Sequence, residues 1–498
     1  MRKLILLSLL FVFLSPNFSV AQKKQRIISA EAKASLISYV EELKSRDTVL
    51  HHALWGIKVV NPSNGDIVVS YNEDASMSPA SNMKLVTTGV TLLTLGPDYR
   101  YETHLKYDGE IASDSVLVGN LYIVGGGDPT LGSNAFKNTI PDSVFCYWTK
   151  ALKNAGIKKI TGSIIADPTT IFDEEYRPDT WAWGDISTGY GAGLGGLQFA
   201  DNLFKIKLVP ASTEGEPALI KSVEPYIPNV VLENYVTTVK ADSTGGVDLI
   251  SSPYSPRILL TGTMALNKKE YSQNAAMPDP AYVCAWYFNQ YLNWSGIATS
   301  GNIQVYHIKA PVDTKDLFTI STYYSPMMSE IVKETNKVSN NSYAESLLKI
   351  VAYEQKGVGS RRVGIKYISE LLEGEGLSLR GVILSDGSGL ARKNMLTPAF
   401  LCDYLTMMKK TPVFEVFEKS LPLAGVDGTL KNMLKGTAAE NNLKAKSGTL
   451  SDARAYSGYV TTKGGHELCF SIIMNNYKYS REVSQRLEKL MRLISEIR

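Results

Sequence analysis

A chain of 498 residues is too long for one compact core, and its length favours about three domains. The composition, 44% hydrophobic and 20% charged, is that of a soluble globular protein. A formal net charge of +3 without any long basic run argues against nucleic acid as a partner.

The first 21 residues have the pattern of a secretory signal peptide. Arg2 and Lys3 precede an apolar run, 4–14, and small residues lead to Ala21, after which we expect cleavage. The run is far shorter than the roughly twenty residues that a membrane span needs, and Pro16 interrupts the segment just beyond it. We therefore expect a periplasmic or otherwise exported protein, with no transmembrane segment after signal removal.

The cysteines and histidines form no recognisable site. Neither type shows the spacing of a zinc site, and the cysteines are too scattered for a disulfide framework (Cys146, Cys284, Cys402 and Cys469). No Gly-x-Ser-x-Gly sequence supports a Ser-His-Asp triad, although the histidines leave that possibility open. We expect no metal and no organic cofactor.

The mature chain opens with a helix and a hairpin. Residues 29–44 carry apolar side chains at helical spacing among many charges, which predicts an amphipathic helix. Residues 55–60 and 67–71 are rich in β-forming side chains, and a turn-like segment separates them. Together with the helix that comes next, these elements form the first part of one domain, residues 22–97.

Ser81 and Lys84 lie three positions apart at the start of a predicted buried helix that ends at Gly96. Side chains three apart share a helix face, so the amine can take the hydroxyl proton. Unpaired N–H groups at a helix start also point where an anion would develop. The pattern alone is weak, because a capping serine beside a solvated lysine looks the same. Ser346 and Lys349 repeat it in what we interpret as an ordinary amphipathic helix.

Short strands and turns replace the helical pattern after this first helix, which indicates a different domain. We assign 98–201 and 271–312 to this second domain, and the valine-, threonine- and proline-rich residues 202–270 to a smaller β unit inserted in it. The glycine run 125–127 lacks the lysine of a P-loop, so we interpret it as a tight turn. The glycine-rich tract 177–196 predicts a long ordered loop.

Helical spacing returns in the last segment, residues 313–498. Ser339 and Asn341 fall in a turn just before a predicted helix, where they either cap the helix or reach into a site. Further on, 443–450 alternates like a strand and carries Lys446, and two more strands and a closing helix come after it. Strands joined by short loops predict an antiparallel sheet, with a cation at a glycine-bearing strand edge.

Ser-x-x-Lys, Ser-x-Asn and Lys-Ser-Gly occur in this order on a helix, a turn and a strand, beginning at Ser81, Ser339 and Lys446. This set resembles that of penicillin-binding proteins and serine β-lactamases. The long stretch between the first two motifs resembles class C low-molecular-mass penicillin-binding proteins, the D-alanyl-D-alanine carboxypeptidase/endopeptidase family. The likeness covers nearly the whole mature chain, including Gly126-Gly127-Asp128-Pro129, the tract from Trp181 to Tyr190, Asp386-Gly387-Ser388-Gly389 and residues 421–430.

The resemblance implies an α/β (α+β) fold, in which a penicillin-binding/β-lactamase-like catalytic domain has an antiparallel sheet flanked by helices. Two nested, largely β inserted domains would interrupt it. The implied activity is that of a serine D-Ala-D-Ala carboxypeptidase and/or endopeptidase. It would cleave peptidoglycan stem peptides and crosslinks through an acyl-enzyme, and β-lactam antibiotics would acylate it. Two departures are Ser447, where the family usually shows threonine, and the unusually glycine-rich residues 193–196.

The resemblance implies a catalytic role for four residues. Ser81 would be the nucleophile and Lys84 the base for acylation, which requires a lowered amine pKa. Burial and the nearby cation of Lys446 are both expected to lower it. Ser339 would relay a proton to the leaving amine, and Asn341 would hold the substrate amide.

The implied binding residues surround this group. Lys446 and Ser447 would bind the terminal carboxylate of the peptide, and the backbone N–H groups of Ser81 and Thr449 would form an oxyanion hole. Asp167, at a strand end in the second domain, resembles a family residue that contacts the amine of the stem peptide.

Two other functions stay open. A noncatalytic relative could bind peptidoglycan through the same groove, but the complete motif set argues against it. A β-lactamase or an esterase would share the motifs, but the large insertion argues against both.

Overall fold

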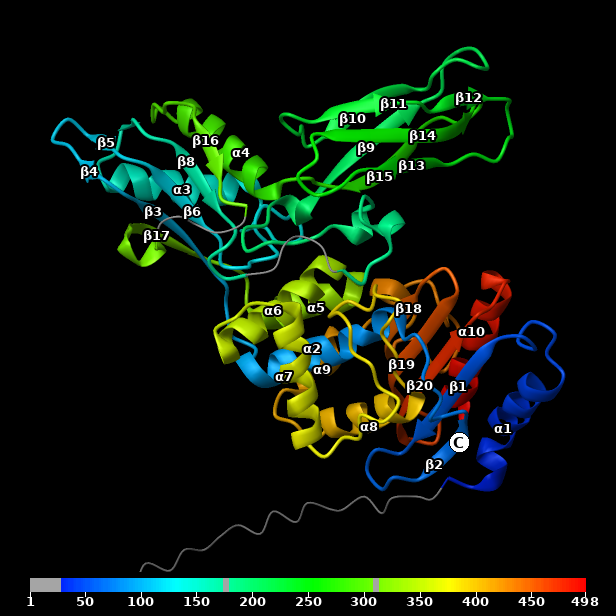
Figure 1. Ribbon diagram of the computed structural model, residues 1–498. Helices are drawn as coiled ribbons and strands as arrows, with labels where there is room; N and C mark the ends of the chain where they lie inside the picture. The colour runs from blue at the N-terminus through cyan, green and yellow to red at the C-terminus, as the bar shows by residue number, and fades with distance from the viewer. Residues whose placement is uncertain (1–27, 173–178, 308–312) are drawn as a thin grey trace, which may run out of the picture.

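The computed structural model describes residues 28–172, 179–307 and 313–498. The predicted signal peptide, with its cleavage site after Ala21, lies outside the described residues. Figure 1 shows a lower body that contains one sheet and most helices, and an upper part built from two β-rich units. Within the described ranges, no helix is long and apolar enough to cross a membrane.

One antiparallel five-stranded sheet joins the two ends of the chain. Its order is β18-β19-β20-β1-β2, and β1 pairs with β20 from Leu54 opposite Asn475 to Val60 opposite Cys469. The early hairpin therefore lies beside the three late strands, whose antiparallel arrangement the sequence predicts. The strands are β1 (Leu54–Val60), β2 (Ile67–Tyr71), β18 (Lys444–Thr449), β19 (Ala453–Thr461) and β20 (Glu467–Asn475).

Helices cover both faces of this sheet. On one face, α1 (Ala30–Ser45) and α10 (Ser480–Glu496) share a core with strand residues such as Ile57 and Ile472. On the other face, α2 (Met83–Leu95) is buried along almost its whole length, as its apolar run requires. The helices that pack around it are α5 (Met328–Val338), α6 (Asn341–Lys356), α7 (Arg361–Gly374), α8 (Pro398–Met408) and α9 (Phe414–Ser420).

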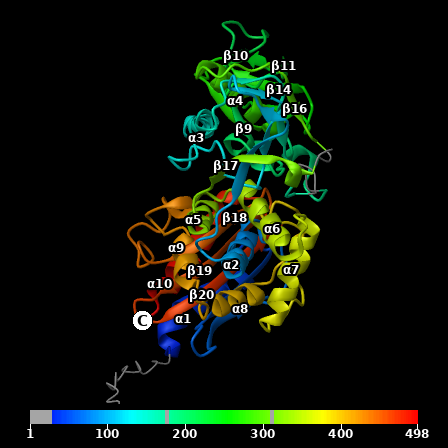
Figure 2. The ribbon, with the colours of Figure 1, turned by 90° about the vertical axis from the view of Figure 1, so that its left-hand side faces the viewer.

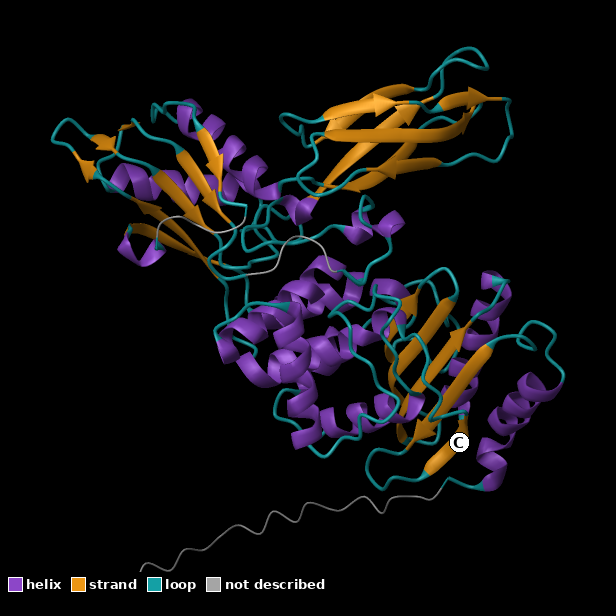
Figure 3. Ribbon diagram, in the orientation of Figure 1, coloured by secondary structure: helices purple, strands orange, loops and turns teal. Residues whose placement is uncertain are grey.

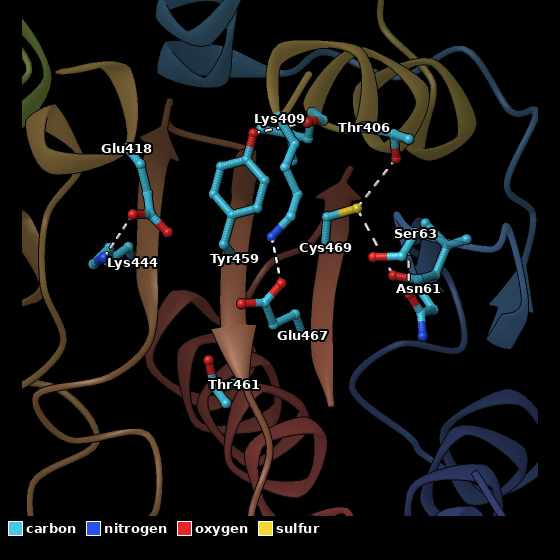
Figure 4. A network of polar contacts seen from close by, with 12 residues as sticks. Asn61, Ser63, Thr406, Lys409, Glu418, Lys444, Tyr459, Thr461, Glu467 and Cys469 are labelled. Atoms are coloured by element: carbon cyan, nitrogen blue, oxygen red, sulfur yellow. Dashed lines mark hydrogen bonds and ion pairs between the residues drawn. The ribbon is translucent and has the colours of Figure 1, made fainter. Parts of the chain in front are cut away.

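Polar contacts tie the helix layer to the sheet where β18 begins. Lys409 and Glu467 form an ion pair at 2.7 Å, and Lys444 and Glu418 form another at 2.8 Å (Figure 4). The Tyr459 hydroxyl, which is buried, donates to the carbonyl of Leu405 at 2.8 Å. Since exposed ion pairs contribute at most about 1 kcal/mol, we expect the buried tyrosine to hold the register of helix and sheet more firmly.

The first inserted unit is a mixed sheet with two helices. Its order is β16-β8-β6-β3-β17, and α3 (Pro141–Asn154) and α4 (Pro280–Trp294) pack against it. The strands are β3 (Glu102–Tyr107), β6 (Leu121–Val124), β8 (Ile164–Asp167), β16 (Ile303–Val305) and β17 (Phe318–Tyr324). A small sheet beside it holds β4 (Glu110–Ile111), β5 (Val116–Val118) and β7 (Lys159–Ile160). This unit is less purely β than expected.

The second inserted unit consists of strands and loops, as Figure 3 shows, and Figure 2 shows both units stacked above the sheet-and-helix body. One of its sheets holds β9 (Leu203–Val209), β10 (Leu219–Glu224) and β15 (Tyr271–Ala276). The other holds β11 (Val231–Asn234), β12 (Thr237–Val239), β13 (Val247–Ile250) and β14 (Arg257–Ala265).

Strand pairing moves two of the expected domain limits. β15 pairs with β9, so the β unit continues beyond residue 270, and β17 pairs with β3, so the first inserted unit continues beyond residue 312. The limits of the three domains remain a proposal. We revise it so that the β unit includes β15 and the first inserted unit includes β17. The α+β class expected from the sequence agrees with this arrangement.

Candidate active site

Ser81 lies at the junction between a tight turn and a buried helix. It is the middle residue of the 3-10 helix η1 (Ala80–Asn82), which runs directly into α2. Ala80 has a left-handed φ of 46°, unusual for a residue with a side chain. The Asn82 side chain donates to Ser457 Oγ on β19 at 2.9 Å. The turn that presents the serine is thus fixed to the sheet.

Two glycines allow neighbouring backbone to approach this turn. A Cβ on Gly448 would lie 2.5 Å from the carbonyl oxygen of Pro79 and 3.1 Å from the Ser81 nitrogen. A Cβ on Gly389, whose φ is 84°, would lie 1.9 Å from the Ala80 carbonyl oxygen. Only glycine fits at these positions. Strand β18 can therefore pass directly beside the backbone of the serine.

Lys84 is completely buried, and its amine faces three acceptors. Nζ donates to Ser81 Oγ at 3.0 Å, to Asn341 Oδ1 at 2.6 Å and to the Ser388 carbonyl at 2.7 Å. Burial lowers the pKa of Lys84 from 10.5 to about 7, against the charges of Asp386 and Glu345, which raise it. A fraction of the amine is therefore unprotonated near neutral pH and can accept the hydroxyl proton of Ser81.

Lys446 forms a second amine–hydroxyl pair in the same site. Its Nζ donates to Ser339 Oγ at 2.9 Å and to the Ser447 carbonyl at 2.8 Å, and the side chain is completely buried. Burial first, and then the charge of Lys84, hold the pKa of Lys446 well below its ordinary value. We expected the charge of Lys446 to lower the pKa of Lys84. In the structure it is the charge of Lys84 that lowers the pKa of Lys446.

Ser339 and Asn341 stand at the junction of α5 and α6. Ser339 ends α5 in the left-handed conformation, with φ 62°, and Asn341 is the first residue of α6. The Asn341 amide donates to the carbonyl of Tyr190 at 2.7 Å while its oxygen accepts from Lys84. The side chain that caps α6 is that of Asn340, which accepts from the Tyr343 N–H. The side chains of both predicted residues are therefore directed to the site rather than to the start of α6.

The cleft itself has a volume of about 510 Å³. Ser81, Ser339, Asn341 and Thr449 line it, and Lys84, Lys446 and Ser447 join it through the contacts above or through β18. The Ser447 hydroxyl donates to Thr429 Oγ1 at 2.7 Å. Seven of the eight predicted site residues are thereby brought together: Ser81, Lys84, Ser339, Asn341, Lys446, Ser447 and Thr449.

Asp167 is placed differently. It ends β8, its side chain is completely buried, and its carboxylate accepts from the Thr169 N–H and from the hydroxyls of Thr169 and Thr170 at 2.6 to 2.8 Å. It does not line the cleft. The carboxylate that does is Asp185, which accepts from the Tyr190 hydroxyl at 3.0 Å. The sequence does show Asp185 a few positions before Tyr190, inside the glycine-rich tract 177–196. That tract predicted only a loop, so Asp185 was not proposed as a site residue.

Two buried carboxylates behind Lys84 had no predicted role. The Asp386 carboxylate accepts from the Trp181 indole, the Asn394 amide and the N–H groups of Gly389 and Ala391, all within 2.9 Å. Glu345 accepts from the N–H groups of Gly387 and Ser388. Burial and the charge of Asp386 raise the pKa of Glu345 above its ordinary value. Together they shape the loop whose Ser388 carbonyl meets Lys84.

Replacing Asp386 with alanine should destabilise the protein strongly. Four buried donors would lose their acceptor, and even one such loss costs about 1–3 kcal/mol, so we expect a loss of about 3 kcal/mol or more. Urea unfolding followed by circular dichroism measures it. The exposed Asp114→Ala is the matched control and should change stability by less than about 0.5 kcal/mol. Equal stability of the two variants would contradict this role for Asp386.

Fold and site together define a class of protein. An antiparallel sheet with helices on both faces, and a serine and a buried lysine in contact at one edge of it, are the features of serine acyl-transfer enzymes of the penicillin-binding type. The sequence model of the D-Ala-D-Ala carboxypeptidase 3 (S13) family matches residues 38–496, and the chain belongs to this family of serine-type peptidases. The predicted family and the predicted enzyme class are confirmed.

The chain is similar to several characterised proteins. It is 31% identical over 449 residues to a D-alanyl-D-alanine carboxypeptidase of Actinomadura sp. strain R39, covering 86% of this chain and 79% of that protein. It is 25% identical over 425 residues to the D-alanyl-D-alanine carboxypeptidase DacB of Haemophilus influenzae, covering 85% of each. The crystal structure of penicillin-binding protein 4 from H. influenzae superposes with a TM-score of 0.79 at 24% identity, covering 93% and 98%, and confirms the predicted α+β fold class.

In the part of the chain that the structure describes, no three His, Cys, Asp or Glu side chains come together as a group that could hold a metal ion. The reactive pair of the cleft is the Ser81 hydroxyl and the buried amine of Lys84, whose pKa is about 7. The chemistry that the cleft offers is therefore nucleophilic attack by a serine with proton transfer to an amine.

Proposed function

We propose that Ser81 attacks the carbonyl of a terminal D-Ala-D-Ala bond, or of a peptide crosslink, in peptidoglycan, and that water hydrolyses the resulting acyl-enzyme. The observation that carries this proposal is the 3.0 Å contact between Ser81 Oγ and the buried amine of Lys84, whose pKa is about 7. A lysine with an ordinary pKa would stay protonated at neutral pH and could not act as a base.

Acylation follows from the geometry in two stages. As Ser81 Oγ bonds to the substrate carbonyl carbon, its proton passes to Lys84 Nζ, and the carbonyl oxygen becomes an oxyanion. The backbone N–H groups of Ser81 and Thr449, on adjoining elements, are proposed to bind that oxyanion. When the peptide C–N bond breaks, the leaving amine takes the proton of the Ser339 hydroxyl, and Ser339 Oγ takes a proton in turn from the charged amine of Lys446, which donates to it at 2.9 Å.

Substrate binding is proposed to use the edge of β18 and the lysine beside it. An extended peptide can lie along the strand edge, with its terminal carboxylate near Lys446 and Ser447. The carboxylate would favour the charged form of Lys446 and so counter the burial that lowers its pKa. Asn341 would hold the substrate amide. The resemblance assigned the contact with the stem-peptide amine to Asp167. We propose Asp185 for this contact instead, because Asp185 lines the cleft.

The same attack on a strained cyclic amide would acylate Ser81, so β-lactams are proposed as inhibitors. A structure of the H. influenzae penicillin-binding protein 4 in complex with a β-lactam has the same fold as this chain. The leader pattern of residues 1–21 supports export, which would bring the enzyme to its polymer.

A paired assay tests the proposal. The mature protein is incubated with a fluorescent penicillin and, separately, with a pentapeptide that ends in D-Ala-D-Ala. We expect stable labelling and release of D-alanine. Rapid turnover of the penicillin without D-alanine release would favour a β-lactamase, and the absence of both labelling and release would favour a noncatalytic relative.

The acylation rate should depend on pH through Lys84. Because its pKa is about 7, the free amine that accepts the Ser81 proton is the minor form below pH 7 and the major form above it. We expect kcat/KM to rise about tenfold per unit below pH 7 and to level off above it. The pH profile of pentapeptide hydrolysis measures this, and a profile that is flat between pH 5 and 9 would contradict the assignment of the base.

A further inference from the structure

A second concave region lies in the inserted part of the chain and shares no lining residue with the catalytic cleft. Its volume is about 770 Å³, within the range of about 300–1,000 Å³ that ligand sites occupy. Helices α3 and α4 form one side, and strands β9 and β10 of the β unit contribute Lys205 and Glu224 to the other. Figure 1 shows α4 between the first inserted sheet and these strands. Ligand pockets occur preferentially at such junctions.

Aromatic rings form the floor and one wall of this pocket. Tyr287, Tyr291 and Trp294 recur at helical spacing and share one face of α4, above the buried Phe145 and Phe199. The rings touch in a row: Trp294 and Tyr291 have centroids 5.6 Å apart, Tyr291 and Phe145 5.8 Å, and Phe145 and Phe199 5.7 Å. Trp294 is 81% exposed. An aromatic helix face normally packs into a core, and one that opens to solvent marks a binding surface.

The rim of the pocket is polar and carries both kinds of hydrogen-bonding group. Five exposed side chains surround the rings: Asn134, Asp142, Lys205, Glu224 and Gln290. The amides and the lysine donate, and the carboxylates and the amides accept. The charged side chains of the rim are of both signs: Asp142 and Glu224 are acidic, and Lys205 is basic. This combination matches a ligand with one apolar face and many hydroxyl or amide groups.

We propose that this pocket binds a saccharide, the glycan strand of peptidoglycan, so that the enzyme holds the polymer while the cleft cleaves its peptides. A pyranose ring presents a face of C–H groups, whose partial positive charge suits the negative face of an aromatic ring. Its hydroxyl and acetamido groups need the donors and acceptors that the rim provides. An apolar peptide could cover the rings but would use none of the hydrogen-bonding groups of the rim. The inference rests on the proposed function only for the identity of the polymer.

The test is binding of glycan strands from which the stem peptides have been removed, measured by calorimetry on the full mature protein. Because Trp294 is largely exposed, Trp294→Ala should fold normally, and we expect its Kd for the glycan to rise about tenfold or more. Tyr235→Ala is the matched control, an aromatic residue of the inserted part that is 62% exposed and lies outside the pocket. Its Kd should stay unchanged.

Three results would overturn the proposal: no glycan binding by the unaltered protein, an unchanged Kd for Trp294→Ala, or an equal loss for Tyr235→Ala. A separate assay keeps the two proposals apart. Trp294→Ala should release D-alanine from a soluble pentapeptide at the unaltered rate, but more slowly from intact peptidoglycan. If the unaltered protein binds glycan and fails to hydrolyse the pentapeptide, the proposed catalytic function is wrong and the saccharide site stands.

Discussion

Ser81→Ala should abolish both labelling by penicillin and hydrolysis of the pentapeptide. The acyl bond forms at Ser81 Oγ, and no other hydroxyl contacts Lys84 Nζ in the described residues, so nothing can replace it. We expect kcat/KM to fall on the order of 10⁴-fold or more, as for removal of the nucleophile in other serine hydrolases. Release of D-alanine from the pentapeptide measures the loss. The binding of the peptide should change little, because Ser81 contributes mainly to the reaction itself.

A matched control is available in the second Ser-x-x-Lys sequence. Ser346 lies on α6, where its hydroxyl donates to the Gly127 carbonyl at 2.6 Å and contacts the Tyr101 hydroxyl. Ser346→Ala removes the same atom from the same motif at another place. It should cost some stability but retain labelling. If Ser346→Ala lost labelling and Ser81→Ala kept it, the nucleophile would have been assigned to the wrong motif.

Lys84→Met should lower kcat/KM by a factor on the order of 10² to 10⁴, the usual contribution of a general base. Methionine fills most of the buried volume but cannot take the proton of Ser81. The change also removes the contacts of Nζ with Asn341 and Ser388, so part of the loss comes from the shape of the site. The rate of acylation by a slowly reacting β-lactam, followed by stopped flow, separates these effects from substrate binding.

Lys349→Met serves as the control for this variant. Lys349 is also buried, and its amine lies 5.4 Å from the ring of Phe172 rather than beside a serine of the cleft. We expect near-normal acylation by Lys349→Met. The residual activity of Lys84→Met should also lose the rise with pH around 7. If that rise persisted, another group would be the base.

The Ser-x-x-Lys motif predicted the contact between Ser81 and Lys84, because that contact depends on short spacing. Ser81 and Lys84 share a helix face by geometry alone, and burial of the apolar run beside them indicated a lowered pKa for Lys84. The carboxylates that oppose this shift, Asp386 and Glu345, come from remote segments. Their arrangement around Ser388 depends on tertiary contacts, which no local pattern encodes.

The alternating patterns indicated where strands occur, but they did not indicate which strands pair with one another. Alternation marks a strand but not the sheet it joins, so the sequence could not show that β15 pairs with β9 and β17 with β3, the pairings on which the revised domain limits rest. The helix α3 was not predicted, although Val144, Trp148 and Leu152 have helical spacing. Its aromatic and β-branched residues have lower helix propensity than alanine or leucine, which weakens the helical signal of the segment.

The acidic residue of the cleft could not be chosen from the sequence. A carboxylate at a strand end, such as Asp167, is a reasonable candidate until its neighbours are known. Thr169 and Thr170 satisfy it locally, so it stays buried. Asp185 reaches the cleft because its loop folds back against α6, where Tyr190 accepts from Asn341. The contact between Tyr190 and Asn341 joins segments far apart in the sequence, so no local pattern could predict it.

Mass spectrometry of the protein after reaction with benzylpenicillin tests the central claim most directly. Formation of an acyl-enzyme by Ser81 predicts one added penicilloyl group per chain, and digestion should place it on the peptide that contains Ser81. The adduct should be absent from Ser81→Ala and present on Ser346→Ala. An adduct on any other residue, or an unmodified protein after prolonged incubation, would contradict the account.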